Sequence, residues 1–125
     1  MLPFKFFSAE PSYDAAEVFY VRIDPAICTS EELLKALYYL LWFPGYFGFN
    51  WDALYDCLRD LEWVPQRKVV LVHSALPKLP ESELRIYLEV LRDAALSWEG
   101  DGVHDLEVFF SIDERPRVEM LLAGS

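Results

Sequence analysis

The sequence predicts an α/β fold, in which a three-stranded parallel sheet is packed with helices in the order β-α-α-β-α-β. Three runs have the apolar and β-branched composition of strands, at residues 17–23, 68–73 and 105–111. Between these runs, apolar residues recur at the three- and four-residue spacing of helices. Strands that alternate with helices predict parallel pairing through right-handed crossovers. We expect a single domain over residues 1–125, with a core at about 18–112 and short extensions at both ends.

The first strand is expected at residues 17–23, a run rich in β-branched and aromatic residues that ends at Asp24 and Pro25. The residues before it are treated as an extension beyond the core. Within this extension, residues 4–7 have the composition of a short strand and residues 11–14 that of a turn.

A helix should follow the first strand, with Thr29 or Ser30 as its cap and an end at about Trp42. Its apolar stripe is wide and consists of Leu33, Leu34, Leu37, Leu40 and Leu41. Pro44 and Gly45 then stop the helix, because proline lacks an N–H donor and glycine relaxes the steric limits on φ.

Aromatic residues are concentrated around the loop that follows. Nine of the chain's 20 Phe, Trp and Tyr residues fall between Tyr38 and Tyr55, more than one loop needs to close a core. Asn50 is placed to cap the next helix, because its side-chain oxygen accepts a free N–H of the first turn. We therefore expect this second helix at residues 51–62, ending before Pro65.

The second helix carries apolar and acidic residues on different faces. The spacing predicts an inward stripe of Trp51, Leu54, Leu58 and Leu61. The acids recur every four residues and share one face: Asp52, Asp56 and Asp60. The helix dipole favours the first of these, but the other two gain little from it and repel their neighbours mildly. A cationic partner would offset that repulsion, although the spacing taken alone favours a solvated helix face.

The second half of the chain supplies the remaining elements. Residues 68–73 form a continuous apolar run, as expected of a central strand that is buried on both faces. A third helix should open at residues 80–82 and close at Gly100 and Gly102. The last strand follows at residues 105–111. Beyond it Pro116 interrupts the chain, and residues 118–122 have the composition of a short strand or helix packed on the edge.

The charge balance suits a basic partner and is equally compatible with a surface that serves only solubility. The chain has 11 basic and 21 acidic residues, a formal net charge of −10, which repels a phosphate backbone and argues against direct nucleic-acid binding. Two cysteines do not make a disulfide framework, so we expect both to be reduced. We find neither a signal peptide nor an apolar run long enough to span a membrane. We therefore expect a cytoplasmic protein.

The sequence does not favour an enzyme, a cofactor or a metal site. Two acids on one exposed helical turn lack the cleft that separates paired catalytic carboxylates. His73 lies within an apolar strand and His104 in a loop, and neither has metal-ligand spacing to a cysteine or an acid. Cys57 follows Asp56, whose charge disfavours a reactive thiolate. No glycine-rich phosphate loop, nucleophile elbow or zinc motif is present in the sequence.

The run from Pro44 to Leu58 resembles the signature of the barstar family, small bacterial proteins that inhibit barnase-type ribonucleases. In that signature a proline precedes an aromatic pair, a glycine and one variable residue. An asparagine and an apolar residue follow, and then Asp-Ala-Leu-aromatic-Asp-Cys-Leu. The resemblance implies a barstar-like fold over about residues 18–112 and an intracellular inhibitor rather than an enzyme.

The resemblance also implies roles for individual residues. It carries over Asp56 as the carboxylate that inserts most deeply into the ribonuclease, with Asp52 as its neighbour. Together these two acids mimic the phosphates of RNA. Tyr46, Asn50 and Tyr55 are implied as flanking contacts.

Three further partner contacts are implied by the same resemblance. Phe47 stands where the family commonly has a tyrosine, so it lacks a hydroxyl. Trp63 corresponds to an aromatic contact after the helix, although residues 59–62 do not match the pattern. Asp93 corresponds to an acidic contact on the third helix. The segment around it resembles the family pattern only loosely.

The expected partner is therefore a basic ribonuclease or toxin protein, and we expect the free protein to be a monomer. An alternative keeps the scaffold and changes the partner, as an immunity protein for another toxin nuclease or as a regulator that binds a basic protein. Phe47 and Phe49, which depart from the pattern, and the extended termini favour this alternative.

Overall fold

The computed structural model describes residues 2–100 and 103–124. Its elements are, in chain order, β1 (Phe4–Phe7), β2 (Val18–Ile23), α1 (Ser30–Leu40), α2 (Trp51–Asp60), β3 (Lys68–His73), α3 (Glu81–Ser97), β4 (Asp105–Ser111), a 3-10 turn (Ile112–Glu114) and α4 (Arg115–Leu122). The predicted α/β class is confirmed. The strands pair in the order β1-β4-β3-β2, and every pair is parallel.

The sheet has four strands where the sequence predicted three. The additional strand is β1, in which Phe4 pairs with Val108 and Phe7 with Ser111 of β4. Its Phe4 ring packs edge-on against Phe110, with 5.0 Å between ring centroids. A run of four residues is a weak local signal, and its partner strand lies at the other end of the chain. Residues 1–17 therefore read as an extension in the sequence, although they begin with a strand of the sheet.

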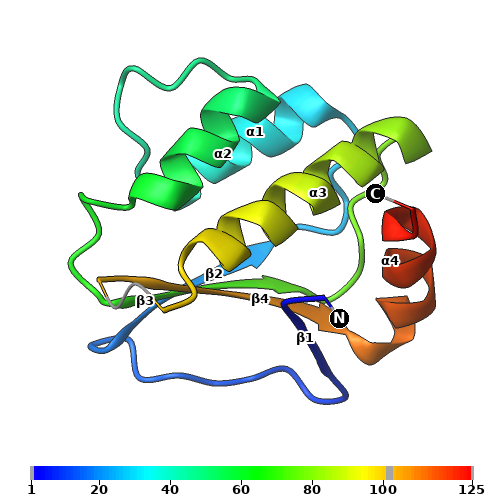
Figure 1. Ribbon diagram of the computed structural model, residues 1–125, viewed down its shortest axis with the longest axis horizontal. Helices are drawn as coiled ribbons and strands as arrows, with labels where there is room; N and C mark the ends of the chain where they lie inside the picture. The colour runs from blue at the N-terminus through cyan, green and yellow to red at the C-terminus, as the bar shows by residue number, and fades with distance from the viewer. Residues whose placement is uncertain (1, 101–102, 125) are drawn as a thin grey trace.

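The two faces of the sheet are covered differently. Figure 1 shows α1, α2 and α3 on one face, α4 beside β1, and residues 8–17 crossing the opposite face. We call residues 8–17 the N-terminal strap. Beneath it the sheet contributes a second, smaller apolar cluster of Val18, Val70, Val72 and Phe109.

Aromatic and polar contacts hold the N-terminal strap on the sheet. The Tyr13 ring lies 5.7 Å from the Tyr20 ring and 6.1 Å from the Phe109 ring, centroid to centroid. Arg22 of β2 forms an ion pair with Glu10 at 2.6 Å between Nε and Oε1. The strap therefore covers apolar strand residues that the helices leave uncovered on this face.

The helix boundaries follow their local signals. Thr29 caps α1 and accepts a hydrogen bond from the Glu32 N–H at 3.1 Å. This helix ends at Leu40, two residues before the expected end, because Trp42 adopts a left-handed φ of 55°. Helix α2 likewise ends at Asp60 rather than residue 62, because Leu61 closes it with a φ of 50°.

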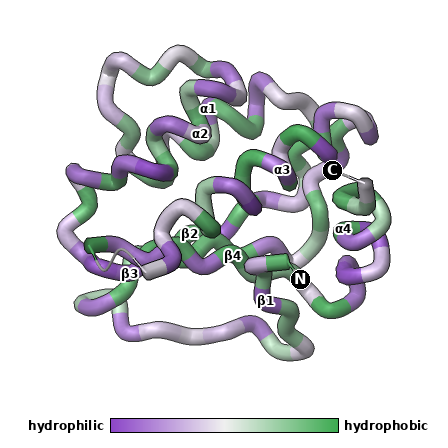
Figure 2. The backbone as a smooth tube through the Cα atoms, viewed as in Figure 1, coloured by the Kyte–Doolittle hydropathy of each residue, from purple (hydrophilic) through white to green (hydrophobic). Residues whose placement is uncertain are grey.

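Helices α2 and α3 lie side by side and run in the same direction. Trp51 of α2 meets Tyr87 of α3 at 6.1 Å between ring centroids, and Trp98 Nε1 donates to the Leu58 carbonyl at 2.8 Å. In Figure 2 hydrophobic and hydrophilic residues alternate along both helices, as amphipathic helices require. Helix α3 ends at Ser97, before Gly100, and the expected closing Gly102 lies outside the described residues.

The C-terminal extension forms α4, one of the two structures that the sequence left open. Its inward side chains are buried and join the main core, together with Phe4 from β1: Val118, Leu121 and Leu122. Segments near both ends of the chain therefore belong to the same hydrophobic core as the elements from β2 to β4.

Candidate partner-binding surface

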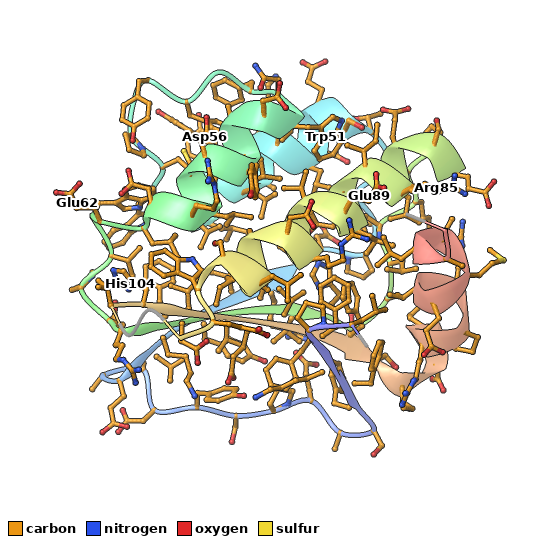
Figure 3. All side chains as sticks on the ribbon, viewed as in Figure 1. Trp51, Asp56, Glu62, Arg85, Glu89 and His104 are labelled. Carbon is orange, nitrogen blue, oxygen red and sulfur yellow. The ribbon has the colours of Figure 1, made fainter. Side chains whose placement is uncertain are left out.

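Helix α2 separates an acidic outer face from an apolar inner face. Its acids are all exposed, and we call them the acidic row: Asp52, Asp56 and Asp60. Leu54 and Leu58 are fully buried on the inner face. Figure 3 labels Asp56 on α2 and Glu89 on the neighbouring α3. The structure thus presents a row of carboxylates to solvent on a helix that is anchored in the core.

The cap of α2 fixes the position of the row. Asn50 Oδ1 accepts a hydrogen bond from the Ala53 N–H at 2.8 Å, and Asn50 Nδ2 donates to the Gly48 carbonyl at 3.3 Å. The side chain of Asn50 is therefore engaged in holding the loop against the helix. Asp52 lies in the first turn, where the positive end of the helix dipole stabilises its charge.

Asp56 forms an ion pair with Arg59, one turn further along α2. Arg59 Nη2 donates to Asp56 Oδ1 at 3.0 Å, and the guanidinium lies 4.2 Å from the centroid of the Tyr55 ring. The Asp56 side chain remains 68% exposed. Two residues predicted to bind the partner therefore contact the same cation of this chain.

The aromatic loop, residues 41–50, places one tyrosine beside the acidic row. Tyr46 is 71% exposed, and its hydroxyl donates to Asp60 Oδ2 at 3.4 Å. This hydrogen bond brings the loop next to the C-terminal turn of α2. Large exposed aromatic rings are enriched among the residues that anchor protein interfaces.

Phe47 points the other way, into the core. It is 4% exposed, and its ring lies 4.9 Å from the rings of Phe43 and Phe49 and 6.0 Å from the Tyr38 ring, between centroids. The structure therefore gives Phe47 no exposed surface with which to contact a partner directly. Its position suits a residue that supports the loop from within.

The two more distant candidates also have internal contacts. Trp63 is half-buried, donates from Nε1 to the Leu41 carbonyl at 2.8 Å and packs edge-on against Phe43. Trp63 thereby ties the segment after α2 to the start of the aromatic loop. Asp93 is exposed on α3 and forms an ion pair with Arg92 at 2.9 Å.

The thiol of Cys57, on the inner side of α2, has low reactivity. Cys57 is buried on the inner side of α2, and burial followed by the charges of Asp60 and Asp56 raises its pKa to about 11. The thiolate that a nucleophile or a metal ligand needs is therefore disfavoured at neutral pH. Within residues 2–100 and 103–124, no group of three His, Cys, Asp or Glu residues is arranged to hold a metal ion.

Near this surface, at the end of α1, the structure exposes two large aromatic residues that were not among the predicted contacts, Tyr39 and Trp42. Trp42 packs edge-on against Phe19 of the edge strand β2 at 5.8 Å between ring centroids. The feature of the sequence that could have identified them is the presence of two aromatic residues at the end of the predicted helix. The spacing of Arg59 three residues after Asp56 was a second signal, since residues at this spacing meet on a helix.

Comparisons with known proteins bear on this surface. A family model described as Barstar (barnase inhibitor) matches residues 18–111, which run from β2 to the end of β4. No curated protein matches the chain significantly. Among the described residues, no helix is long and apolar enough to cross a membrane. Since the family model covers most of the sequence, including α2 and the aromatic loop, the chain belongs to the barstar family.

Proposed function

We propose that the protein inhibits a basic ribonuclease of the barnase type by covering its active site with Asp52 and Asp56 of the acidic row and with the aromatic loop. The observation that carries the proposal is the exposure of Asp52 and Asp56 on a capped helix, beside the exposed ring of Tyr46. Membership of a family described as barnase inhibitors supports the same conclusion.

Electrostatics explains how such a surface stops a ribonuclease. An enzyme that cleaves RNA binds phosphates with cationic side chains. The carboxylates of Asp52 and Asp56 carry the same negative charge as those phosphates and can bind the same cationic side chains. The net charge of −10 attracts a basic enzyme over a distance and raises the association rate. The Asn50 cap holds the helix in place before binding, so that little ordering is required when the complex forms.

Tyr46, Tyr55 and Asp93 complete the proposed contact surface at its margins, and Asn50 and Trp63 position it. Phe47, whose side chain is buried, acts in this proposal by holding the loop against the core. The surface is therefore assembled from α2, α3 and the aromatic loop.

The proposal is tested by adding the purified protein to barnase and measuring RNA cleavage. We expect inhibition at a one-to-one ratio that weakens with added salt, since salt screens exposed charges. Association and dissociation rates are then compared for Asp56→Ala and Asp60→Ala. Asp56→Ala should accelerate dissociation more, because it leaves the cations of the enzyme buried without an anion.

Asp60→Ala is the matched control, because it removes the same charge from the same helix outside the signature, and Tyr46→Phe measures separately the loss of the Tyr46–Asp60 hydrogen bond. It should produce only a small decrease in the association rate. Thermal unfolding of both variants checks that the fold is intact. Equal effects of the two substitutions, or uninhibited cleavage by barnase, would count against the proposal.

A different basic partner on the same scaffold is the second candidate, as an immunity protein or a regulator. The observation that favours it is Phe49, an apolar residue that is 45% exposed at the variable position of the signature. A panel of basic toxin nucleases tests it, with cleavage of their own substrates as the readout. Inhibition of one of these and not of barnase would select this second function.

A further inference from the structure

Arg59 is the one residue of α2 whose charge opposes that of the acidic row. Its guanidinium is held from two sides, by the Asp56 carboxylate at 3.0 Å and by the Tyr55 ring at 4.2 Å from the centroid. It also lies in the last turn of α2, where the negative end of the helix dipole stabilises a cation. These three effects act together to keep Arg59 on Asp56.

The other acids near this face differ from Asp56. Asp52 forms no ion pair within the part of the chain that the structure describes. Asp93 forms its ion pair with Arg92, whose side chain is only 19% exposed and makes further contacts. Arg59 is 45% exposed, so solvent and an approaching partner reach it.

We propose that Arg59 is a specificity-determining residue of the partner-binding surface. In the free protein it occupies Asp56 as an internal stand-in for the cation of the partner, and the partner must displace it to reach the carboxylate. The inference rests on the proposed function for the identity of the partner, and it assigns Arg59 the role of selecting among cationic proteins.

The exchange of one cation for another sets the selectivity. A partner with an isolated ammonium group forms one ion pair with Asp56, which is worth little more than the Arg59–Asp56 ion pair that it displaces. A partner that brings a guanidinium regains two parallel hydrogen bonds to the carboxylate and stacking on Tyr55. Arg59 therefore weakens binding to generally basic proteins while it permits binding to an arginine-containing active site.

The first test uses a nine-residue lysine peptide as the cationic probe, titrated into isotopically labelled protein at low salt. The variants are Arg59→Gln, Arg59→Lys and Arg117→Gln, the last an equal change of charge on the exposed surface of α4. Arg59→Gln should bind the peptide about fivefold more tightly than Arg117→Gln, with amide shifts at Tyr55 and Asp56. Arg59→Lys keeps the net charge and should fall between wild type and Arg59→Gln.

Equal peptide affinities of Arg59→Gln and Arg117→Gln would overturn the proposal, because only net charge would then matter. Shifts that avoid Asp56 would overturn it as well. A readout on the free protein checks the geometry: the Arg59 side-chain protons should show a ring-current shift that Tyr55→Leu removes. Thermal unfolding confirms that the variants are folded.

Barnase inhibition separates this inference from the proposed function. If wild-type protein leaves barnase active while Arg59→Gln still tightens peptide binding at Asp56, the proposed ribonuclease partner is wrong and the role of Arg59 stands. If barnase is inhibited and Arg59→Gln behaves as Arg117→Gln does in both assays, the function stands and the role of Arg59 is rejected.

Discussion

The hydroxyl of Tyr87 donates a hydrogen bond to Nε2 of His73, at 2.7 Å, in the centre of the core. The direction of this bond follows from the other ring nitrogen. His73 Nδ1 lies 3.0 Å from the carbonyl oxygen of Phe109, which only accepts, so Nδ1 carries the proton. Both polar side chains are thereby satisfied without water.

Removal of the Tyr87 hydroxyl should destabilise the fold. Tyr87→Phe leaves Nε2 of His73 buried without a donor, which costs about 1–3 kcal/mol of unfolding free energy. Urea unfolding measures the loss. Tyr39→Phe, at a hydroxyl on the exposed surface, is the control and should leave the midpoint unchanged. A similar midpoint for both variants would show that the pair contributes no stability.

The same histidine predicts how stability depends on pH. Burial lowers the pKa of His73 from its ordinary 6.5 to about 4. Between these values the unfolded chain binds a proton and the folded chain does not. The unfolding free energy should therefore fall as the pH decreases from 6.5 towards 4, by up to about 1.4 kcal/mol per pH unit. Denaturation series at fixed pH values measure this slope.

The substitution His73→Gln tests whether His73 causes this slope, and the carboxyl group of Glu107 has to be considered beside it. His73→Gln should flatten the slope above pH 5 while lowering stability at neutral pH. Glu107 acts in a lower pH range: burial alone would raise its pKa, but Lys5 and Lys68 outweigh burial and lower it below the ordinary 4.5. Its contribution is lost only as the pH falls through that lowered pKa. An unchanged slope in His73→Gln would assign the effect elsewhere.

The two cysteines should differ in reactivity. Cys28 is exposed and Cys57 is buried with its pKa raised to about 11, and neither forms a disulfide in the structure. Iodoacetamide at neutral pH should therefore add one group to the native protein and a second only after unfolding in urea. Mass spectrometry of digested protein assigns the groups. Rapid native modification of Cys57 would contradict its burial under α2.

Neighbouring aromatic residues of the loop should separate binding from stability. Tyr46→Ala removes an exposed ring and should weaken barnase binding by more than about 1 kcal/mol without changing the melt. Phe47→Ala empties a buried site and should lower the unfolding free energy by about 3–5 kcal/mol. Binding kinetics and urea unfolding of both variants give the comparison. A stable Phe47→Ala variant with weakened binding would reverse these roles.

Local signals allowed much of the fold to be predicted from the sequence. The bounds of β3 and β4 agree with their apolar runs, and the caps of α1 and α2 agree with the predicted residues. The position of β1 depends instead on pairing with a strand at the far end of the chain. The four residues of β1 have the composition of a strand, but nothing in them indicates the strand with which they pair.

The surface was predictable where it is periodic. Helical spacing places Asp52 and Asp56 on an outer face, and both are exposed. The aromatic loop has no period, so spacing does not tell which of Tyr46 and Phe47 faces solvent. That choice follows from packing against rings of other segments, such as Tyr38.

The sheet has α1, α2 and α3 on one face only (Figure 1), and the segments that cover its other face and its β4 edge lie outside the residues that the family model matches. The matched segment, residues 18–111, contains neither β1, nor the N-terminal strap, nor α4. A fragment cut to those limits would uncover Val70, Val72 and Phe109 and open the outer edge of β4. Bare apolar strands with an open edge pair with other chains. We therefore expect a fragment of residues 18–111 to aggregate, because β1 and the N-terminal strap cover this edge and these apolar residues in the full chain.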